Sequence, residues 1–339
     1  MNDKTEKKEL AILRLLEKAG GPLTSSRLVD NLQAMGYEVS QRTVRHYFQE
    51  LDRRGLTESF GKKGRSITEK GLAELHDARV FDKVGFLSAR IDQLTYRMNF
   101  DLKRRSGTVI ANISIVDAAL LGGLVQRIRR VYESGYGMGN LMALFGPGEK
   151  AGDVVVPAGM VGLGTVCSIT LNGVLLARGI PTHSSFGGLL EVREGKPARF
   201  VEIIKYEGTS LDPLEIFIKG GMTSALQTVE TGNGRIGVGF RELPADSRDS
   251  VLKLNRKLEN AGLGGFMMVG WPGQPLLEVP VNEGRVGAIV IGGLNPAATL
   301  EETGVKVGSR ALAGMIEYEE LFHYEEMEDR LKELQIIQS

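Results

Sequence analysis

The segment VPAGMVGLGTVCSITLNGVLLARGI (156–180) and the segment VPVNEGRVGAIVIGGLNPAATLEETGV (279–305) are two versions of one pattern. When they are aligned on their first prolines, Asn172 falls on Asn295. Each segment has an apolar strand pattern that ends at Leu-Asn-Gly or Leu-Asn-Pro, where a short helix is predicted to begin. Because self-similarity of this kind marks a repeated structural unit, the sequence predicts a domain made of two similar α/β halves.

The match continues on both sides of these segments. Gly164 aligns with Gly287, and further along the chain Gly188 aligns with Gly314. The first strand of each half is predicted at TVIANISIVD and at RIGVGFREL. The predicted α/β domain covers residues 107–330, with halves at about 108–206 and 235–324.

The helix starts after the two repeated strands are predicted anion sites. Asn172 and Asn295 are suitable N-caps, and the free backbone N–H groups of a helix N-terminus attract a carboxylate. The two halves differ in the residues before the helix, which are polar in the first half and aliphatic or glycine in the second. The polar set is Thr165, Cys167, Ser168 and Thr170.

Composition excludes several classes of protein. The chain has 339 residues, of which 42% are hydrophobic, so it can bury at least one large core. Its apolar runs are shorter than the ~18 residues of a membrane helix, and its charged first residues lack a signal sequence. A single cysteine and four scattered histidines make neither an internal disulfide nor a zinc site. We therefore expect a cytoplasmic protein with no membrane partner, no metal and no cofactor.

The first 79 residues predict a DNA-binding unit. Residues 1–70 carry fourteen Lys or Arg against ten Asp or Glu, a net charge of about +4. Three short amphipathic helices, with Thr24 and Ser40 as caps, precede a strand, a basic glycine-flanked turn, a second strand and a helix. This order resembles a winged helix. The third helix and the turn supply the candidate DNA contacts, which are Ser40, Gln41, Arg42, Thr43, Arg45, His46, Lys62, Lys63 and Arg65.

An ordinary solvated face would explain one basic helix, but three helices in this order with a basic turn favour DNA. A helical connector is predicted over residues 80–106. It could form a dimer seam, dock onto the next domain or pack on its own core, and a dimer is favoured because such readers usually bind two half-sites. Its apolar stripe consists of Val80, Val84, Leu87, Ile91, Leu94 and Met98.

The motifs VCSITLNGVLLARGIP, FGGLLEV, TSLDPLEIFIKGGMT and AIVIGGLNPAATLEETG, placed after a winged helix, resemble the NrpR family of archaeal nitrogen regulators over about residues 8–325. The resemblance implies a homodimeric repressor of nitrogen-fixation and ammonium-assimilation genes, bound to promoter DNA and released by 2-oxoglutarate. Some members of the family carry two regulatory domains, so a second NrpR-type chain is a possible partner of this one.

Three readings of Cys167 remain open from the residues. It could be a nucleophile with His183 as base, a packing residue, or part of a pocket that binds a small anion. The absence of a recognisable orienting group for His183 disfavours catalysis, so no catalytic residue is assigned. An anion also favours a cation, for which Arg178, Arg199, Arg241 and Arg310 are candidates. The effector site is predicted at Thr165, Cys167, Ser168, Thr170, Asn172, His183, Ser185 and Arg310.

Overall fold

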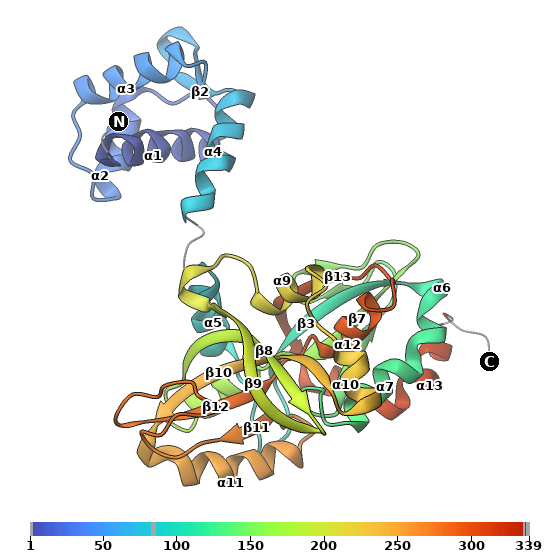
Figure 1. Cartoon of the computed structure of the whole chain (residues 1–339). Helices are drawn as coiled ribbons and strands as arrows, with labels where there is room; N and C mark the ends of the chain where they lie inside the picture. Colours follow the sequence, from blue (N-terminus) through green and yellow to red (C-terminus); the bar gives the residue numbers. More distant parts are fainter. Residues whose placement is uncertain (1–2, 83–85, 335, 337–339) are drawn as a thin grey trace. The chain divides into compact units, whose positions relative to one another are not determined.

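The computed structural model describes residues 3–82, 86–334 and 336, and it divides into two units, residues 1–84 and 85–339 (Figure 1). Unit 1 has the predicted winged-helix order. Thr24 caps α2 by accepting from the Arg27 N–H, and Ser40 caps α3 by accepting from the Thr43 N–H, which confirms both predicted caps. Its elements are α1 (Asp3–Ala19), α2 (Ser25–Ala34), α3 (Gln41–Arg53), β1 (Thr57–Ser59), the 3-10 turn η1 (Gly61–Lys63), β2 (Arg65–Ile67) and α4 (Glu69–Asp82).

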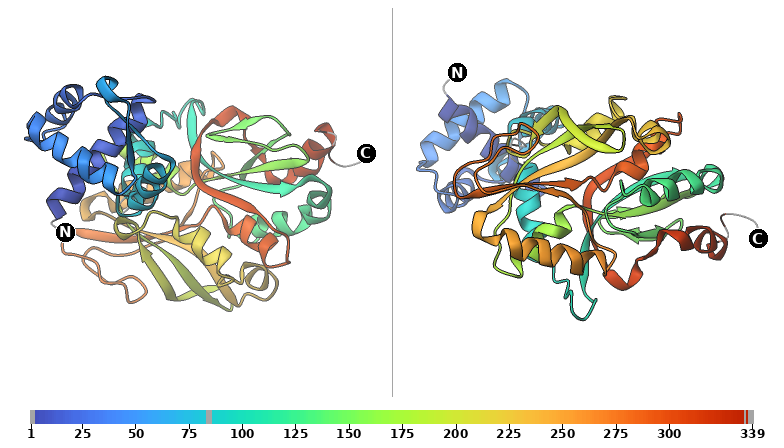
Figure 2. Two further views of the ribbon diagram at one scale, coloured as in Figure 1. Left: turned by 90° about the horizontal axis from the view of Figure 1, so that it is seen from above. Right: turned by 60° about the horizontal axis from the view of Figure 1, so that its bottom comes forward.

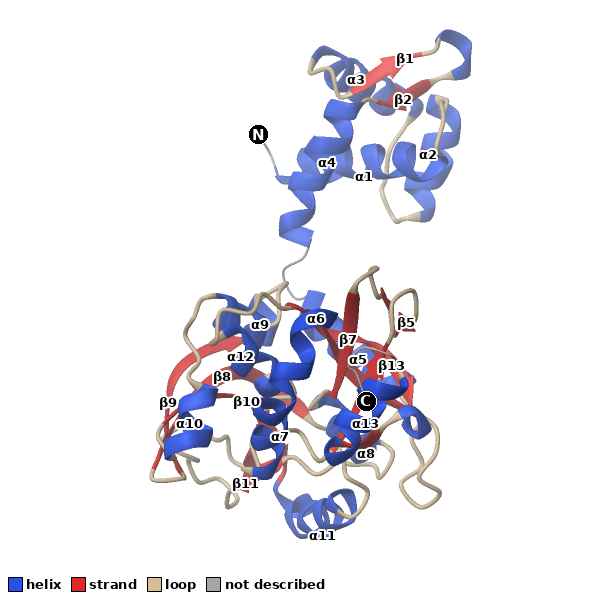
Figure 3. Cartoon of the chain, turned by 90° about the vertical axis from the view of Figure 1, so that its right-hand side faces the viewer, coloured by secondary structure: helices blue, strands red, loops and turns tan. Residues whose placement is uncertain are grey.

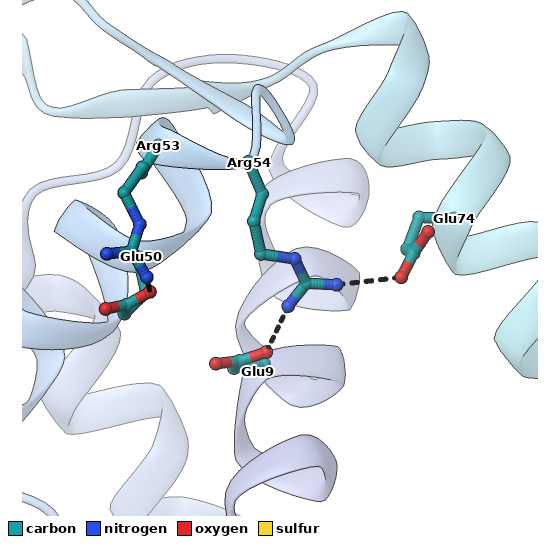
Figure 4. Close-up of polar contacts among 5 residues, drawn as sticks. All are labelled: Glu9, Glu50, Arg53, Arg54 and Glu74. Carbon is teal, nitrogen blue, oxygen red and sulfur yellow. Dashed lines mark hydrogen bonds and ion pairs between the residues drawn. The ribbon is translucent and has the colours of Figure 1, made fainter. Parts of the chain in front are cut away.

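A three-way ionic contact fixes the end of α3 in unit 1. Arg54 Nη1 lies 2.7 Å from Glu9 Oε2 of α1, and its Nη2 lies 2.8 Å from Glu74 Oε1 of α4 (Figure 4). Glu9 is 8% exposed in its side chain, so this carboxylate depends on Arg54 for its charge partner. Arg53, one residue earlier, pairs with Glu50 on the surface of the same helix and with no other acidic residue in the described part of the chain.

Arg54→Met should lower the free energy of unfolding of unit 1 by about 1–3 kcal/mol, because the buried Glu9 carboxylate loses its charged donor. Arg53→Met is the matched control and should change it by less than about 0.5 kcal/mol, since exposed pairs contribute little. Urea titration of the full chain, read by hydrogen exchange of α1 peptides, separates unit 1 from unit 2. Equal effects of the two variants would contradict this assignment.

The connector differs from the predicted single element over 80–106. The helix α5 (Phe86–Arg97) belongs to unit 2, and the residues from 98 to 106 form turns. Its apolar stripe is buried against unit 2, where Leu87, Ile91 and Leu94 pack with Cys167 and neighbouring residues. Leu87, Ile91 and Leu94 thus pack on their own domain, one of the alternatives that the sequence left open, and the predicted dimer stays a prediction. The Val80 side chain lies outside the described part of the chain. Val84 lies outside the described residues.

Unit 2 contains two five-stranded antiparallel sheets and the helices that cover them. The first half of the sequence supplies β3 (Thr108–Asp117), α6 (Ala118–Leu121), η2 (Gly122–Leu124), α7 (Val125–Glu133), β4 (Leu141–Phe145), β5 (Lys150–Ala151), β6 (Val154–Val155), β7 (Met160–Val166), α8 (Ile169–Leu176), β8 (His183–Arg193) and β9 (Lys196–Lys205). A linking stretch then forms η3 (Tyr206–Gly208), α9 (Pro213–Lys219) and α10 (Ala225–Thr231). The second half supplies β10 (Gly234–Pro244), η4 (Ala245–Ser247), α11 (Arg248–Glu259), β11 (Phe266–Val269), β12 (Arg285–Ile291), α12 (Asn295–Glu301), β13 (Gly308–Glu317), η5 (Tyr318–Glu320), β14 (Phe322–His323), η6 (Tyr324–Glu326) and α13 (Met327–Glu333).

Each sheet takes strands from both halves. One sheet has the order β13-β3-β7-β4-β14 and the other β11-β12-β10-β8-β9, so β8 leaves the first half to pair with β10 and β13 leaves the second to pair with β3. Figure 2 shows this exchange, with the red-orange β13 beside the teal β3. The predicted duplication is present, but the halves are intertwined and are not two side-by-side bodies.

The exchanged strands occupy equivalent places. Gly188 of β8 lies opposite Val238 of β10, and Gly314 of β13 lies opposite Ala111 of β3, which agrees with the predicted match of Gly188 and Gly314. Helices also pair across the halves: α7 packs on α12, and these two helices lie close together in Figure 3. In the same way, residues of α8 from the first half and of α11 from the second half share one hydrophobic core.

The predicted register of the central segments is wrong by two residues. Thr170 Oγ1 bonds both the N–H and the C=O of Ile110 on β3, and the Asn295 side chain bonds both groups of Gly237 on β10. Thr170, and not Asn172, is therefore the counterpart of Asn295. Likewise Gly162 lies opposite Ile115 as Gly287 lies opposite Glu242, so Gly162 takes the place predicted for Gly164.

The two asparagines are also not helix caps. Asn172 lies buried inside α8, and Asn295 is the first residue of α12. Their predicted capping role is corrected, because Ser168 and Leu294 hold the cap positions and neither makes a side-chain capping bond. The buried side-chain amides of Asn172 and Asn295 instead form hydrogen bonds with neighbouring strands and side chains.

Candidate functional site

The outer face of α3 in unit 1 carries the first candidate site. Gln41, Arg42, Arg45 and His46 are exposed, while Val44, Tyr47, Phe48 and Leu51 fill the core. The hydroxyls of Ser40 and Thr43 lie 2.9 Å apart and are engaged in the cap of the helix. Within the described residues Arg42 and Arg45 make no ion pair, so their guanidinium groups are free to contact a phosphate or a base edge.

The hairpin β1–β2 holds the other predicted DNA contacts. Lys62 and Lys63 are exposed in η1. Arg65 is different, since its Nε lies 2.7 Å from Asp52 Oδ2 and its guanidinium carbon lies 4.9 Å from the centroid of the Phe48 ring. Arg65 therefore stabilises the hairpin against α3. A groove of about 280 Å³ separates Lys62 from Arg45, with the start of α2 on its floor.

The second candidate site is a small pocket in unit 2 between the two repeated strand-to-helix turns. The turn after β7 contributes Cys167 and Ser168, and the turn after β12 contributes Gly292 and Gly293. Cys167 N–H donates to the Ile110 C=O over 2.8 Å, and Gly292 N–H donates to the Gly237 C=O over 2.9 Å, which shows that the two turns are equivalent. The pocket therefore draws on both halves. The other residues used below that line it are Ile91, Asn112, Tyr206, Asp212, Ala311 and Leu312.

Glycines in the second half provide the space at this pocket. A Cβ on Gly293 would lie 2.2 Å from the Val166 oxygen and 2.5 Å from Asn112 Nδ2, so only glycine permits this approach. A Cβ on Gly239 would lie 2.7 Å from Arg241 Nη1. At the pocket the first half contributes the polar residues Asn112, Cys167 and Ser168, whereas the second half contributes glycines at the equivalent positions. The pocket therefore has one polar wall.

Arg241 lies behind this polar wall with its side chain fully inside the protein. The residue is 1% exposed, and it donates to Asn172 Oδ1, Phe240 O and Ser168 Oγ, each over 3.2 Å. Its guanidinium carbon lies 5.6 Å from the centroid of the Tyr206 ring. Among the described residues no carboxylate forms an ion pair with it, although an unpaired buried charge is costly. The Asp212 carboxyl lies near enough for Arg241 to lower its pKa, so it offsets part of this charge without forming an ion pair.

The titratable groups at the pocket have pKa values shifted by burial. Burial raises the pKa of the Cys167 thiol to about 12 and that of Tyr206 to about 12. Burial, with a smaller contribution from Glu215, raises the pKa of Asp212 to about 6. The Cys167 side chain is therefore a neutral thiol near pH 7, which is a poor nucleophile.

The structure brings together only part of the predicted effector site. Cys167 and Ser168 line the pocket. Thr165 is buried 3.5 Å from Asn112 Nδ2, and Thr170 binds Ile110, so both are structural. Asn172 reaches the site indirectly, because it accepts from Arg241 and donates to Ser184 Oγ.

The remaining three predicted effector residues do not line the pocket. Ser185 donates to Glu242 Oε1 over 3.2 Å, and His183 is exposed at the first position of β8. Arg310 is exposed on β13, whereas Arg241, another of the four candidate arginines, is buried behind the pocket. Sequence alignment across the repeat placed Arg310 beside a site strand but carried no information about which side chain is buried.

Three residues at the pocket were not assigned to it from the sequence, and Arg241 was one of four arginines that spacing could not rank. Arg241 and Asn112 lie in strands whose residues are mostly buried, GRIGVGFRELP and TVIANISIVD, and a polar residue among buried positions is a usable signal. Asp212 caps α9 by accepting from the N–H groups of Leu214 and Glu215, a role that needs no ligand and gives no signal of a pocket. Tyr206 gave no signal, because it lies in the link between the halves.

Comparison with known proteins assigns the two units. Residues 84–323 match the family model of the NrpR regulatory domains NRD1 and 2, and residues 10–75 match a model of the ribonuclease R winged-helix domain. The chain belongs to the NrpR family. It is 34% identical over 319 residues to the global nitrogen regulator NrpRI of Methanosarcina mazei, an alignment that covers 94% of this chain and 98% of that protein.

Other NrpR proteins are longer. The global nitrogen regulators NrpR of Methanocaldococcus jannaschii and Methanococcus maripaludis are 30% and 28% identical, over 93% and 87% of this chain but only 55% and 51% of their own lengths. A crystal structure of a nitrogen repressor-like protein from Methanococcus jannaschii superimposes with a TM-score of 0.59 at 25% identity, over 70% of this chain and 97% of that one. The chain is thus a winged-helix member of a family of nitrogen regulators.

Two further structural findings concern partners. No helix in the described part of the chain is long and apolar enough to span a bilayer. Over the same residues, no three His, Cys, Asp or Glu side chains are placed to hold a metal ion.

Proposed function

We propose that the chain is a cytoplasmic transcriptional repressor of nitrogen-fixation and ammonium-assimilation genes, that it binds promoter DNA as a homodimer, and that 2-oxoglutarate releases it. The names of its relatives support the link to nitrogen. The exposed arginines of α3, Arg42 and Arg45, and the exposed lysines of η1 support DNA as a partner. Two relatives about twice as long support a second NrpR-type chain as a further partner.

The observation that carries the effector assignment is the buried Arg241 guanidinium without a carboxylate partner beside Ser168. A carboxylate of 2-oxoglutarate is the anion proposed to pair with it, through charge-assisted hydrogen bonds. The neutral Cys167 thiol supports a binding role over a catalytic one. The effector would lie beside Ser168 and Asn112, whose side chains can donate hydrogen bonds to its oxygens.

The size of the pocket suggests how binding acts on the protein. Its cavity volume is about 20 Å³, room for about one water molecule, so a five-carbon dicarboxylate requires a wider pocket. An effector that binds only a widened state shifts the population toward that state. We propose that the widened state has low affinity for the operator. A differential affinity of a few kcal/mol is enough for this change in occupancy.

Fluorescence anisotropy tests the proposal. The purified chain is titrated with promoter DNA of its own nitrogen-assimilation genes at fixed salt, since phosphate contacts make affinity salt-dependent. 2-Oxoglutarate is then added, with glutarate and citrate as controls. Weakening of DNA binding by 2-oxoglutarate alone is expected. Tight binding that ignores 2-oxoglutarate would reject the effector, and a lack of specific binding by the chain would reject autonomous repression.

Binding of 2-oxoglutarate should tighten by about 3- to 10-fold when the pH falls from 7.5 to 5.5, which corresponds to about 0.7–1.4 kcal/mol of relieved repulsion. With a pKa of about 6, the Asp212 carboxyl is mostly ionised at the higher pH and mostly protonated at the lower one. Protonation removes a negative charge that faces the anion. Calorimetric titration at the two pH values measures the change.

The matched variant is Asp212→Asn, because asparagine can still cap α9 but does not titrate in this range. Its affinity should be nearly independent of pH and at least as high as that of the wild type. If the variant kept the full pH dependence, another group would be responsible for it.

A further inference from the structure

We infer that α5 carries the state of the pocket to the winged helix, and that Arg90 is the positioning residue that couples them. This inference rests on the proposed function, since it concerns the regulation of the same pocket. It adds a route for the signal, which neither the family match nor the pocket itself supplies. The route runs from the pocket wall to α5 and from there along the chain to unit 1.

The helix α5 is both a wall of the pocket and the first helix of unit 2. Its residue Ile91 lines the cavity and packs in one cluster with Tyr206 and Leu312, which line it too. The preceding helix of the chain is α4 of unit 1, and only residues 83–85 separate the two. A displacement of α5 therefore acts directly on the covalent link to the winged helix.

The second part of the wall is a bulge in β13. The ladder between β13 and β3 is interrupted between Arg310 and Gly314, and Leu312 in this bulge has a φ of 50°. A left-handed conformation at a leucine is strained and persists only when its surroundings hold it. Two side chains hold its backbone: Asn112 Oδ1 accepts from the Leu312 N–H over 3.2 Å, and Arg90 donates to the Leu312 C=O over 3.3 Å.

Arg90 joins three elements at once. Besides the Leu312 C=O, its Nη2 lies 2.6 Å from Asp153 Oδ2, in the turn between β5 and β6. Asp153 N–H in turn donates to the C=O of Ala313 in the bulge, over 2.8 Å. Figure 3 shows α5 close to β13, with which it is in contact. Arg90 thus ties the position of α5 to the conformation of the bulge.

The opposite wall of the pocket is hydrogen-bonded to the sheets. The turn after β7 is bonded to Ile110 through Cys167 N–H and Thr170, and Asn295 of α12 makes three hydrogen bonds with β10 and the Tyr136 C=O. Because the pocket must widen to admit a dicarboxylate, we infer that the wall formed with α5 moves, and that the hydrogen bonds of Arg90 and Asn112 to Leu312 and of the Ala311 N–H to Glu215 set its position. That wall consists of Ile91 on α5 and of Ala311 and Leu312 in the bulge.

The test measures coupling separately from binding. For the full-length wild type and for Arg90→Met, calorimetry gives the affinity for 2-oxoglutarate, and anisotropy gives the operator affinity without and with saturating 2-oxoglutarate. In the wild type we expect 2-oxoglutarate to weaken operator binding by about 5- to 150-fold, the usual range of allosteric coupling. In Arg90→Met the weakening should fall below about threefold. Operator affinity without 2-oxoglutarate should stay within about threefold of the wild type.

Arg97→Met is the matched control, because it removes the same charge from an exposed position of the same helix. It should respond as the wild type does. Retained 2-oxoglutarate binding by Arg90→Met shows that the variant is folded, and Asp153→Asn, which weakens the same tie, should give an intermediate response. A normal response of Arg90→Met would overturn the coupling role. A wild type that binds no 2-oxoglutarate would overturn the proposed effector instead, so the two failures are distinguishable.

Discussion

Arg241→Met should weaken binding of 2-oxoglutarate by about 100-fold or more while the protein stays folded. The expected loss is large because the guanidinium is 1% exposed and lies beside Ser168 without a carboxylate partner. Losing a buried charged partner of an anion costs about 2–5 kcal/mol. The variant removes a buried charge but leaves Asn172 Oδ1 and Phe240 O without their donor, so we expect a loss of stability of about 1–3 kcal/mol, which is measured separately from binding.

The two readouts together separate binding from folding. Calorimetric titration gives the affinity, and thermal unfolding without 2-oxoglutarate gives the stability. Arg199→Met is the matched control, since Arg199 is exposed and, among the described residues, forms an ion pair only with Glu191 of β8. It should bind 2-oxoglutarate as the wild type does. An unchanged affinity in Arg241→Met would exclude Arg241 as the anchor of the anion.

The double variant Arg42→Ala/Arg45→Ala should lose operator affinity by about 100-fold or more, because each base or phosphate contact of this kind is worth about 1–3 kcal/mol. Both side chains are exposed on the outer face of α3 and make no ion pair with other described residues. Removing two phosphate contacts should also reduce the slope of log affinity against log salt by about 2. Anisotropy over a range of salt concentrations measures both quantities.

The control for this variant lies on the same helix. Arg53 is exposed but pairs with Glu50 at the other end of α3, so Arg53→Ala should leave operator affinity within about threefold. Binding of 2-oxoglutarate should be unchanged in all of these variants, since the pocket belongs to unit 2. If Arg53→Ala reduced affinity as much as the double variant, general charge and not a defined face of α3 would account for binding.

Local patterns in the sequence predicted the elements that depend on local chemistry. The caps Thr24 and Ser40 were identified because a hydroxyl before an apolar helical period satisfies free N–H groups, and both are confirmed. The duplication followed from repeated glycines and asparagines, and the match of Gly188 with Gly314 agrees with the sheets. Cys167 and Ser168 were placed at the pocket because they interrupt an apolar segment at a strand end.

What the sequence did not reveal depends on contacts between distant segments. Asn172 looked like a cap because it aligned with Asn295, yet the loop between β11 and β12 shifts the true register, and Thr170 makes the equivalent bonds. Arg310 and Arg241 cannot be ranked by spacing, since burial depends on which strand covers them. Arg65 looked like a free wing cation, and only the fold shows its pair with Asp52.

The exchange of β8 and β13 between the halves sets a condition on how this protein is made. During synthesis β3 has no partner on one side until residues 308–317 have been added, near the end of the chain. Until then its edge is open to pairing with other chains. Contacts between such distant residues also make folding slow. We therefore expect newly made chains to depend on protection from aggregation until β13 has been added, and neither half, expressed alone, to fold into a stable domain.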